Sequence, residues 1–285
     1  MKLIRFGKQG EEKPGILLSN DEKIDASSFV SDYDEKFFGS GGLISLKDWL
    51  SENEASAPRL DDNVRIGSPI ARPSKIICIG LNFKDHAAES GFDAPEEPLI
   101  FGKATSAICG PYDNIIIPRG SEQTDWEVEL GVVIGKKTSY VDQDQALEHV
   151  GGYVLHNDVS ERAFQKDRGG QWIKGKSADT FAPMGPFMAT PDEIDNISDM
   201  RMWLNVNGEN MQDGNTSNLI FSVDHVVSYL SQFMTLLPGD VISTGTPAGV
   251  GMGMNPEKYL KPGDVVELGI DGLGSSKQNV VAYEE

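Results

Sequence analysis

Two glutamates stand two residues apart, at Glu127 and Glu129, in the otherwise apolar stretch of residues 124–135. The Trp, Val and Ile residues of this stretch favour a β-strand, in which alternate side chains emerge on the same face. The two carboxylates would therefore point the same way while losing hydration. A positive charge must compensate them, and a hard cation is the simplest candidate.

A third carboxylate is needed to complete a metal site, and Asp158 is the best candidate. It ends the strand-like run of residues 152–158, and strand ends commonly display functional side chains. Three carboxylates around one divalent ion suit Mg²⁺, which prefers octahedral oxygen ligation and retains open positions. The competing interpretation is an exposed strand with solvated acids, which is where Glu-x-Glu often occurs.

A second pair of residues that could do chemistry is His86 and Glu89. They are three residues apart, so a helical turn would place them side by side. A carboxylate beside a histidine fixes its tautomer and supports its work as a general base. The alternative is a surface histidine near a surface glutamate. Gly and Pro bound the surrounding residues 82–98, which favours a lid, with Phe92 among its positions.

Two further segments carry features of binding loops. Lys176 follows Gly175 in a partly apolar loop over residues 170–181, where it could hold an anionic substrate or a developing enolate, unless it is simply solvated. Residues 243–253 are rich in Gly, which lets backbone N–H groups approach an anion. No helix opens after them and no βαβ unit surrounds them, so nucleotide binding is rejected.

The elements that must position these residues belong to a strand-rich α+β chain. Strands are expected near residues 75–81, 115–118, 124–135, 152–158 and 200–206, the last ending in an Asn207-Gly208 hairpin turn. Residues 142–150 and 222–236 have helical patterns, the latter the longest amphipathic one. Strands do not alternate regularly with helices, so a doubly wound parallel sheet is not expected.

Composition limits the class of protein. The chain of 285 residues suits one large domain with a small appendage. We predict a small N-terminal α/β domain over residues 1–56, a linker over 57–74 and a catalytic domain over 75–285. The net charge of -19 argues against a nucleic-acid partner, because phosphate binding needs Lys and Arg clusters. Apolar runs are too short for a spanning helix, so we expect no membrane partner and a cytoplasmic location.

Together these residues resemble the fumarylacetoacetate hydrolase family over about residues 75–285. The family's metal motif resembles Glu127, Glu129 and Asp158, and its lid dyad resembles His86 and Glu89. Four further positions match motifs that follow in the same order. These are Arg162 and Gln165 of an Arg-x-x-Gln motif, the catalytic Lys176, and Thr246 of the Thr-Gly-Thr-Pro loop. Phe83 stands where many relatives have Tyr, so a substrate hydrogen bond at that position is lost.

The resemblance implies a fold and a reaction. The fold would be a mixed, strand-rich β-barrel or roll in a homodimer, with a small N-terminal domain. The substrate would be a small anionic 2,4-dioxo acid, either an acylpyruvate or a 2,4-diketo-3-deoxy sugar acid, bound with Mg²⁺ or alternatively Mn²⁺. His86 and Glu89 would activate a water that attacks C4, breaking the C3–C4 bond to give pyruvate, with Phe83, Arg162, Gln165 and Thr246 contacting the substrate.

Two other functions remain open from the sequence. The same metal-stabilised enolate would serve an oxaloacetate-type decarboxylase, a ureidoglycolate lyase-like enzyme or an isomerase, none of which needs an attacking water. A chain that keeps the metal site could also bind small dicarboxylates without turning them over. The dyad and Lys176 favour an enzyme over a binder.

Overall fold

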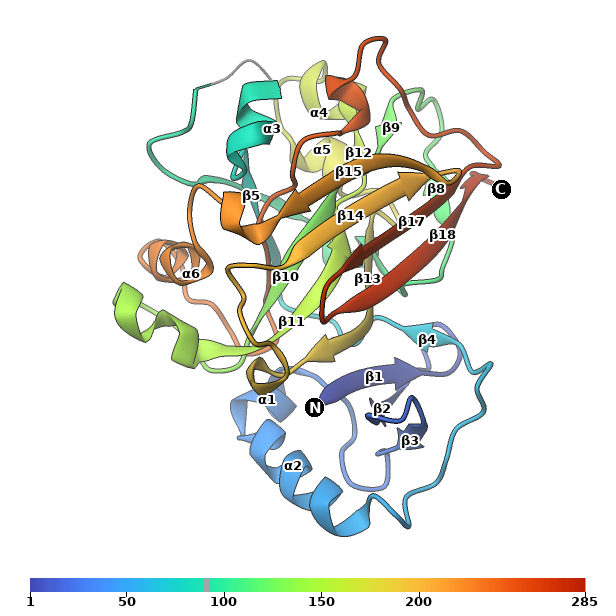
Figure 1. The fold of residues 1–285 in the computed structure, drawn as a ribbon, viewed down its shortest axis with the longest axis vertical. Helices are drawn as coiled ribbons and strands as arrows, with labels where there is room; N and C mark the ends of the chain where they lie inside the picture. The colour runs from blue at the N-terminus through green and yellow to red at the C-terminus, as the bar shows by residue number, and fades with distance from the viewer. Residues whose placement is uncertain (90–92, 285) are drawn as a thin grey trace.

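The fold described here is that of a computed structural model, and it covers residues 1–89 and 93–284. Phe92, the named lid position, lies outside the described residues. Among those that are described, two large sheets pack on one another and helices cover their margins (Figure 1). The strand-rich α+β fold is therefore confirmed, with mixed sheets and no closed barrel in the part of the chain that the structure describes.

The larger sheet holds eleven strands among the described residues, and its main path runs β3-β2-β1-β13-β11-β10-β16-β5-β6. Its strands are β1 (Lys2–Phe6), β2 (Lys13–Leu17), β3 (Lys23–Asp25), β4 (Ile66–Gly67), β5 (Ile76–Gly80), β6 (Leu99–Lys103), β7 (Ile108–Cys109), β10 (Val128–Ile134), β11 (Val150–Asn157), β13 (Ala182–Ala189) and β16 (Val241–Ser243). Most neighbours are antiparallel, but β5 runs parallel to β16, so the sheet is mixed.

The second sheet has the order β15-β14-β17-β18-β8 over the described chain. Its strands are β8 (Ile115–Ile117), β14 (Arg201–Val206), β15 (Glu209–Asn215), β17 (Val265–Ile270) and β18 (Gly274–Ala282). A short pair, β9 (Thr124–Asp125) and β12 (Ser160–Glu161), stands apart from both sheets. The predicted hairpin at Asn207-Gly208 is confirmed, since both residues have the positive φ that such a turn requires.

Helices are few and short. They are α1 (Glu35–Gly39), α2 (Gly42–Asn53), α3 (Lys84–Glu89), α4 (Arg162–Lys166), α5 (Ile173–Lys176) and α6 (Val223–Ser231). Short 3₁₀ turns add η1 (Thr105–Ala107), η2 (Gln143–His149), η3 (Pro191–Glu193), η4 (Thr216–Asn218) and η5 (Gly251–Gly253). No helix within the described ranges is both long and apolar enough to cross a bilayer.

Two sequence expectations about helices were wrong in detail. The helix expected over residues 222–236 ends at Ser231, because Leu236 instead pairs with Thr138 as an isolated β-bridge. It is also shorter than α2, which has 12 residues. Lys176 does not sit in a loop: it ends the short helix α5.

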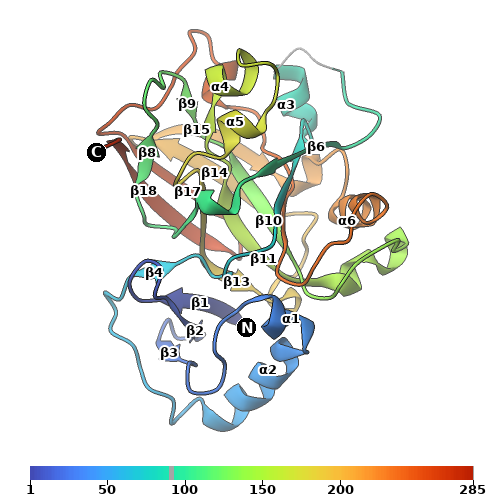
Figure 2. The same ribbon diagram turned by 180° about the vertical axis from the view of Figure 1, so that it is seen from behind.

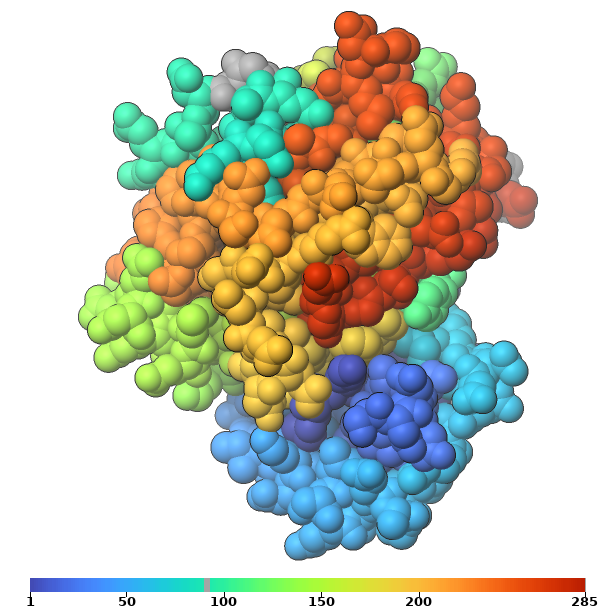
Figure 3. Space-filling view, viewed as in Figure 1, coloured from blue at the N-terminus to red at the C-terminus, as the bar shows by residue number. Residues whose placement is uncertain are grey.

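The N-terminal residues form one end of the molecule, drawn in blue in Figure 3. Their sheet is continuous with the rest, since Lys2 and Leu3 of β1 pair with Ala189 and Met188 of β13. The short strand β4, inside the expected linker, also pairs with β1. The division into residues 1–56, 57–74 and 75–285 stays a prediction, and main-chain hydrogen bonds tie the first segment to the last.

Candidate active site

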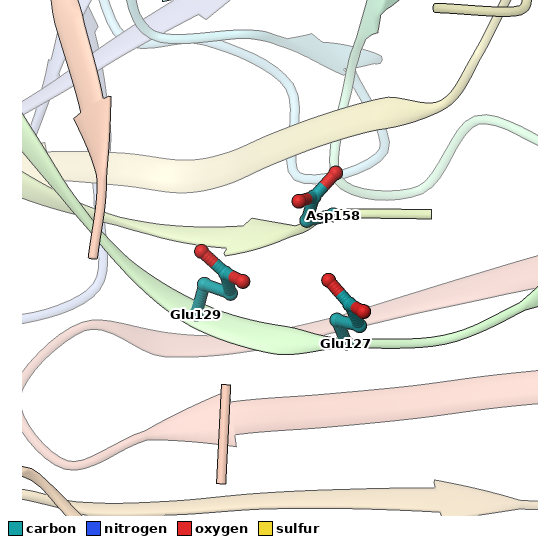
Figure 4. A group of neighbouring side chains, drawn as sticks. All are labelled: Glu127, Glu129 and Asp158. Carbon is teal, nitrogen blue, oxygen red and sulfur yellow. The ribbon is translucent and has the colours of Figure 1, made fainter. Parts of the chain in front are cut away.

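The neighbouring strands β10 and β11 bring the three predicted acids together. Their antiparallel register pairs Val128 with Asn157, so Glu127 lies opposite Asp158, and the Asp158 N–H donates to the Glu127 carbonyl over 2.9 Å. Directly opposed side chains share one face, as do residues two apart on a strand. Glu127, Glu129 and Asp158 therefore converge, each with a carboxylate oxygen within 4.8 Å of the others (Figure 4).

The face opposite to these acids packs on the five-stranded sheet. The Asn157 amide, which alternates with Asp158, donates to Gln278 Oε1 of β18 over 3.2 Å. With both faces covered, every residue of β10 and β11 is buried. This explains why the strands read as nearly continuous apolar runs in which charged residues stand out.

Buried cations compensate the acids. The ammonium of Lys176 lies 2.7 Å from Glu127 Oε2 and 2.8 Å from Asp158 Oδ2. Lys103 pairs with the other Asp158 oxygen, and an Arg162 amino group lies 2.8 Å from Glu127 Oε1. Burial alone would raise the pKa of Asp158, but Lys103 and Lys176 hold it below its ordinary value. The cluster thus has the positive charge that its apolar setting demands.

Glu129 is the acid with the least compensation. Burial, and then repulsion by the other two carboxylates, raise its pKa well above the ordinary value. Its Oε2 accepts hydrogen bonds from the Ser243 hydroxyl over 2.5 Å and from the Gly245 N–H over 2.9 Å. Burial lowers the pKa of His156 to about 3, so this ring is neutral, and its Nδ1 lies 2.6 Å from Ser243 Oγ. A neutral ring that donates to Ser243 orients that hydroxyl toward Glu129.

Glu127 and Glu129 of this cluster line a cavity of about 430 Å³. The other polar side chains on its wall are His86, Arg162, Gln165, Lys166, Lys176 and Thr246. The apolar wall residues are Ile79, Leu81, Leu99, Phe101, Trp172 and Met252. A cavity of this size with a few convergent polar groups is typical of a small-molecule site.

The predicted His86–Glu89 pair lies on α3, which is at the same end of the molecule as α4 and α5 (Figure 2). His86 lines the cavity, and its Nδ1 lies 3.4 Å from Glu89 Oε2. Glu89 is not part of the cavity wall that the structure describes. Instead, its carboxylate accepts the Gly249 N–H over 3.0 and 3.1 Å. His86 therefore lies between the cavity and Glu89. In this position the glutamate can orient the imidazole ring but does not face a ligand in the cavity.

Helices α4 and α5 present the remaining polar side chains. Glu161 caps α4 by accepting the Phe164 N–H over 2.8 Å. Arg162 and Gln165 then follow three residues apart on one face, and Arg162 Nη1 donates to Gln165 Oε1 over 3.1 Å. The close approach of α5 requires glycine, since a Cβ at Gly175 would lie 2.4 Å from the Glu161 carbonyl oxygen. Lys176 is thereby held against the acids.

Two predicted substrate contacts have a different setting from the one expected. Phe83 is fully buried in the hydrophobic core and is not among the cavity-lining residues, so the structure places it behind the wall rather than on it. Thr246 does line the cavity. Its hydroxyl, however, donates to the Val128 carbonyl over 3.0 Å and accepts from Gln212 Nε2 over 2.8 Å. Thr246 therefore fixes the loop against β10, and its remaining surface faces the cavity.

Sequence reasoning missed four residues of this cluster: Lys103, Asp125, His156 and Ser243. Asp125 is fully buried, and its Oδ2 accepts from Arg162 Nε over 2.8 Å and from the Met252 N–H over 3.0 Å. Its position two residues before Glu127 could have indicated it, because alternate residues of a strand share one face. Lys103 has no such signal, because it meets Asp158 across 55 positions of sequence.

The donor set fits a hard divalent cation. All three converging ligands are carboxylates, the oxygen donors that Mg²⁺ and Mn²⁺ prefer over softer metals. Glu129 Oε1 accepts no hydrogen bond from any residue that the structure describes, which leaves a ligand atom free. Three carboxylates in one face of a sheet also leave the cavity side open for water or substrate.

Comparison with known proteins agrees with this geometry. Residues 75–281 match the fumarylacetoacetate (FAA) hydrolase C-terminal family, so the chain belongs to that family of enzymes, which includes hydrolases and isomerases. A protein of Burkholderia ambifaria is 51% identical over 280 residues, covering 98% of both chains, and is named "Putative hydrolase". The resemblance inferred from the sequence motifs is confirmed.

Solved structures extend the likeness to the whole chain. The fumarylacetoacetate hydrolase of Exiguobacterium antarcticum is 35% identical, with a TM-score of 0.87, over 99% of this chain and 100% of that one. Maleylpyruvate hydrolase of Sphingobium sp. SYK-6, in complex with manganese(II) and pyruvate, is 27% identical, with a TM-score of 0.83, over both full chains. A probable 2-hydroxyhepta-2,4-diene-1,7-dioate isomerase of Mycobacterium abscessus is 31% identical, with a TM-score of 0.81, over both full chains.

Proposed function

We propose that this protein is a metal-dependent hydrolase that cleaves the C3–C4 bond of a 2,4-dioxo acid, giving pyruvate and a carboxylic acid. The observation that carries the proposal is the convergence of Glu127, Glu129 and Asp158 beside a cavity that is lined by the two glutamates, His86 and Lys176. The manganese and pyruvate named for the Sphingobium enzyme support the same class of ligand. Mg²⁺ is the proposed metal, with Mn²⁺ as its alternative.

The charge balance of the cluster favours an anionic substrate. Among the described residues, four buried carboxyl groups meet three buried cations, so the cluster has one negative charge in excess when all four are ionised, as metal ligation by Glu129 would require. A bound divalent ion would turn this into an excess of one positive charge. The carboxylate of a 2-oxo acid would cancel that excess, which a neutral substrate would not do.

The chain's own residues divide the reaction between them. When bound, the divalent ion supplies Lewis acidity at the substrate's C2 oxygen. Arg162 and Gln165 line the cavity, and Gln165 Nε2 has no partner within the described chain, so it is free to donate to the substrate carboxylate.

His86 then acts as the general base. It takes a proton from water as the water oxygen bonds to C4, and Glu89 holds the resulting imidazolium in place. The C3–C4 bond breaks with its electron pair moving to C3. The proton that His86 took from water passes to C3, which completes pyruvate and returns the imidazole to its neutral form, and C4 leaves as the carboxylic acid.

The test is a substrate panel of acylpyruvates, 2,4-diketo-3-deoxy sugar acids and oxaloacetate, assayed for pyruvate with and without EDTA. We expect pyruvate and a carboxylic acid in equal amounts from one 2,4-dioxo class, and loss of activity with EDTA that Mg²⁺ or Mn²⁺ restores. Turnover that EDTA leaves unchanged would overturn the proposal. Tight 2-oxo acid binding with no product over hours would identify a binder instead.

A decarboxylase or isomerase is the second candidate, because an isomerase is among the structural neighbours. These reactions need no attacking water. Only hydrolysis therefore depends on His86 as the general base. We expect His86→Ala to lower kcat by roughly 10²–10⁴ with metal affinity unchanged, because only proton transfer is lost. Steady-state kinetics and a calorimetric metal titration measure the two quantities. Full turnover by this variant would favour the second candidate.

A further inference from the structure

The ammonium of Lys176 lies between two of the three converging acids, Glu127 and Asp158. Its Nζ lies 2.7 Å from Glu127 Oε2 and 2.8 Å from Asp158 Oδ2, and the side chain is only 2% exposed. Mg²⁺ binds carboxylate oxygens at about 2.0–2.1 Å. A divalent ion shared by Glu127 and Asp158 would therefore sit at the point where the ammonium now lies.

The second carboxylate oxygen of Glu127 and that of Asp158 pair with other cations. Glu127 Oε1 is held by Arg162, and the outer oxygen of Asp158 is held by Lys103. On Glu127 and Asp158, the oxygens that contact Lys176 are the ones that do not already pair with Arg162 or Lys103, so they are the best-placed metal ligands on these two residues. Metal and ammonium thus compete for the same two ligand atoms.

We propose that Lys176 is an internal counter-ion that fills the metal site in the metal-free protein and is displaced toward the cavity when a divalent ion binds. This inference rests on the metal site of the proposed function. It adds that metal binding must break two buried ion pairs. Two cations cannot both contact these oxygens in a buried site without strong mutual repulsion.

The two buried lysines, Lys103 and Lys176, differ in whether their ammonium groups can move into the cavity. The Lys103 side chain is fully buried, lies outside the cavity wall that the structure describes, and also donates to the Val159 carbonyl over 3.0 Å. Lys176 lines the cavity, and its Nζ lies 4.9 Å from the centre of the Phe101 ring, which also faces the cavity. An aromatic face stabilises a displaced ammonium. Lys176 can therefore move, whereas Lys103 stays.

Displacement has a functional consequence for the order of binding. Once freed from the acids, the ammonium faces the cavity, where it can pair with the carboxylate of an incoming substrate. Without the metal, Lys176 is neutralised by Glu127 and Asp158 and offers little to an anion. Metal should consequently bind first and create the anion-binding charge.

The test compares the Mg²⁺ and Mn²⁺ affinities of two charge-matched variants by calorimetry, without substrate. Lys176→Met removes the competitor. Lys166→Met removes a cation that lines the same cavity and whose Nζ, among the described residues, has Met252 Sδ at 3.4 Å as its polar partner, so it controls for the general loss of positive charge. We expect Lys176→Met to bind the metals at least about ten-fold more tightly than Lys166→Met does.

Each outcome decides the inference. Equal or weaker binding by Lys176→Met, with circular dichroism showing both variants folded, would overturn it. If Lys176→Met does not fold without metal, crystal structures of the unmodified protein with and without Mg²⁺ decide. Lys176 Nζ beyond about 4 Å from both acids in the Mg²⁺ form supports displacement, and an unchanged position contradicts it. No metal binding by the unmodified protein would instead overturn the proposed function itself.

Discussion

At the scale of single residues, the site is a buried charge cluster whose members are not equivalent. Glu129 differs from the other two acids because no cation among the described residues contacts it, so burial raises its pKa, whereas Lys103 and Lys176 lower that of Asp158. Asp125 has a different role, because it joins Arg162 to the loop at Gly251 and Met252. Glu129 is therefore the acid best suited to gain a metal ion, whereas Asp125 stabilises the structure around the site.

Glu129→Gln should weaken Mg²⁺ binding at least about ten-fold with little change in metal-free stability. An amide resembles the protonated acid, and its oxygen can still accept from Ser243 and Gly245. Calorimetric titration of EDTA-treated protein measures affinity, and thermal melting measures stability. An unchanged metal titration would refute the ligand assignment.

Asp125→Asn should destabilise the protein by about 3 kcal/mol, because it leaves the buried Arg162 with one carboxylate fewer. Urea denaturation measures the change. Asp213→Asn is the matched control, since Asp213 pairs with Arg201 on the surface and its loss should matter far less. Equal effects would show that the Asp125 pair is not specially important.

At the scale of elements, the site is held by loops that glycines allow to approach closely. Residues 244–254 contact β10 through Thr246, Asp125 through Gly251, and Glu89 of α3 through Gly249. This loop therefore couples the acid cluster to the His86–Glu89 helix. The contact to α3 is a main-chain one on the loop side, because the Gly249 N–H donates to the Glu89 carboxylate.

Gly249→Ala should destabilise the protein markedly more than Gly263→Ala. Both glycines have nearly the same positive φ, +104° and +99°, so both variants carry similar backbone strain, about 1–2 kcal/mol. A Cβ at Gly249 would also lie 1.9 Å from the Met211 carbonyl oxygen, whereas at Gly263 it meets nothing within 4 Å. Urea unfolding compares the two, and equal losses would show that strain alone matters.

Much of the site could be predicted because its signals are local. Glu127 and Glu129 interrupt an apolar strand, and His86 and Glu89 share a helical turn. Lys103 and His156 could not be predicted, because a lysine in an apolar strand becomes informative only when the fold sets it against Asp158. Likewise, the end of α6 was set by the bridge between Leu236 and Thr138, a tertiary contact that overrides helical periodicity.

At the scale of the whole molecule, one hydrophobic core runs from the N-terminal strands to the last one. Leu3 of β1 and Val280 of β18 belong to the same cluster of buried side chains. The β1–β13 pairing adds main-chain hydrogen bonds across the predicted domain division. The N-terminal segment is thus packed as part of the same body that carries the active site (Figures 1 and 3).

The full chain should accordingly unfold in one cooperative transition. Trp49, which stacks on Phe29 in the N-terminal segment, gives a local fluorescence probe once the other three tryptophans are replaced by Phe. Its urea midpoint should match that of far-ultraviolet circular dichroism on the same variant. A distinctly lower midpoint for Trp49 would show that the N-terminal segment unfolds independently.

The environment of the two cysteines affects how such measurements can be made. Cys78, on β5, and Cys109, on β7, are both buried, and burial raises the pKa of each thiol. A thiol that stays protonated and shielded reacts slowly with oxygen or with alkylating reagents. Metal titrations can therefore be run in buffers free of dithiothreitol, a chelator that would otherwise distort the apparent affinity for Mn²⁺.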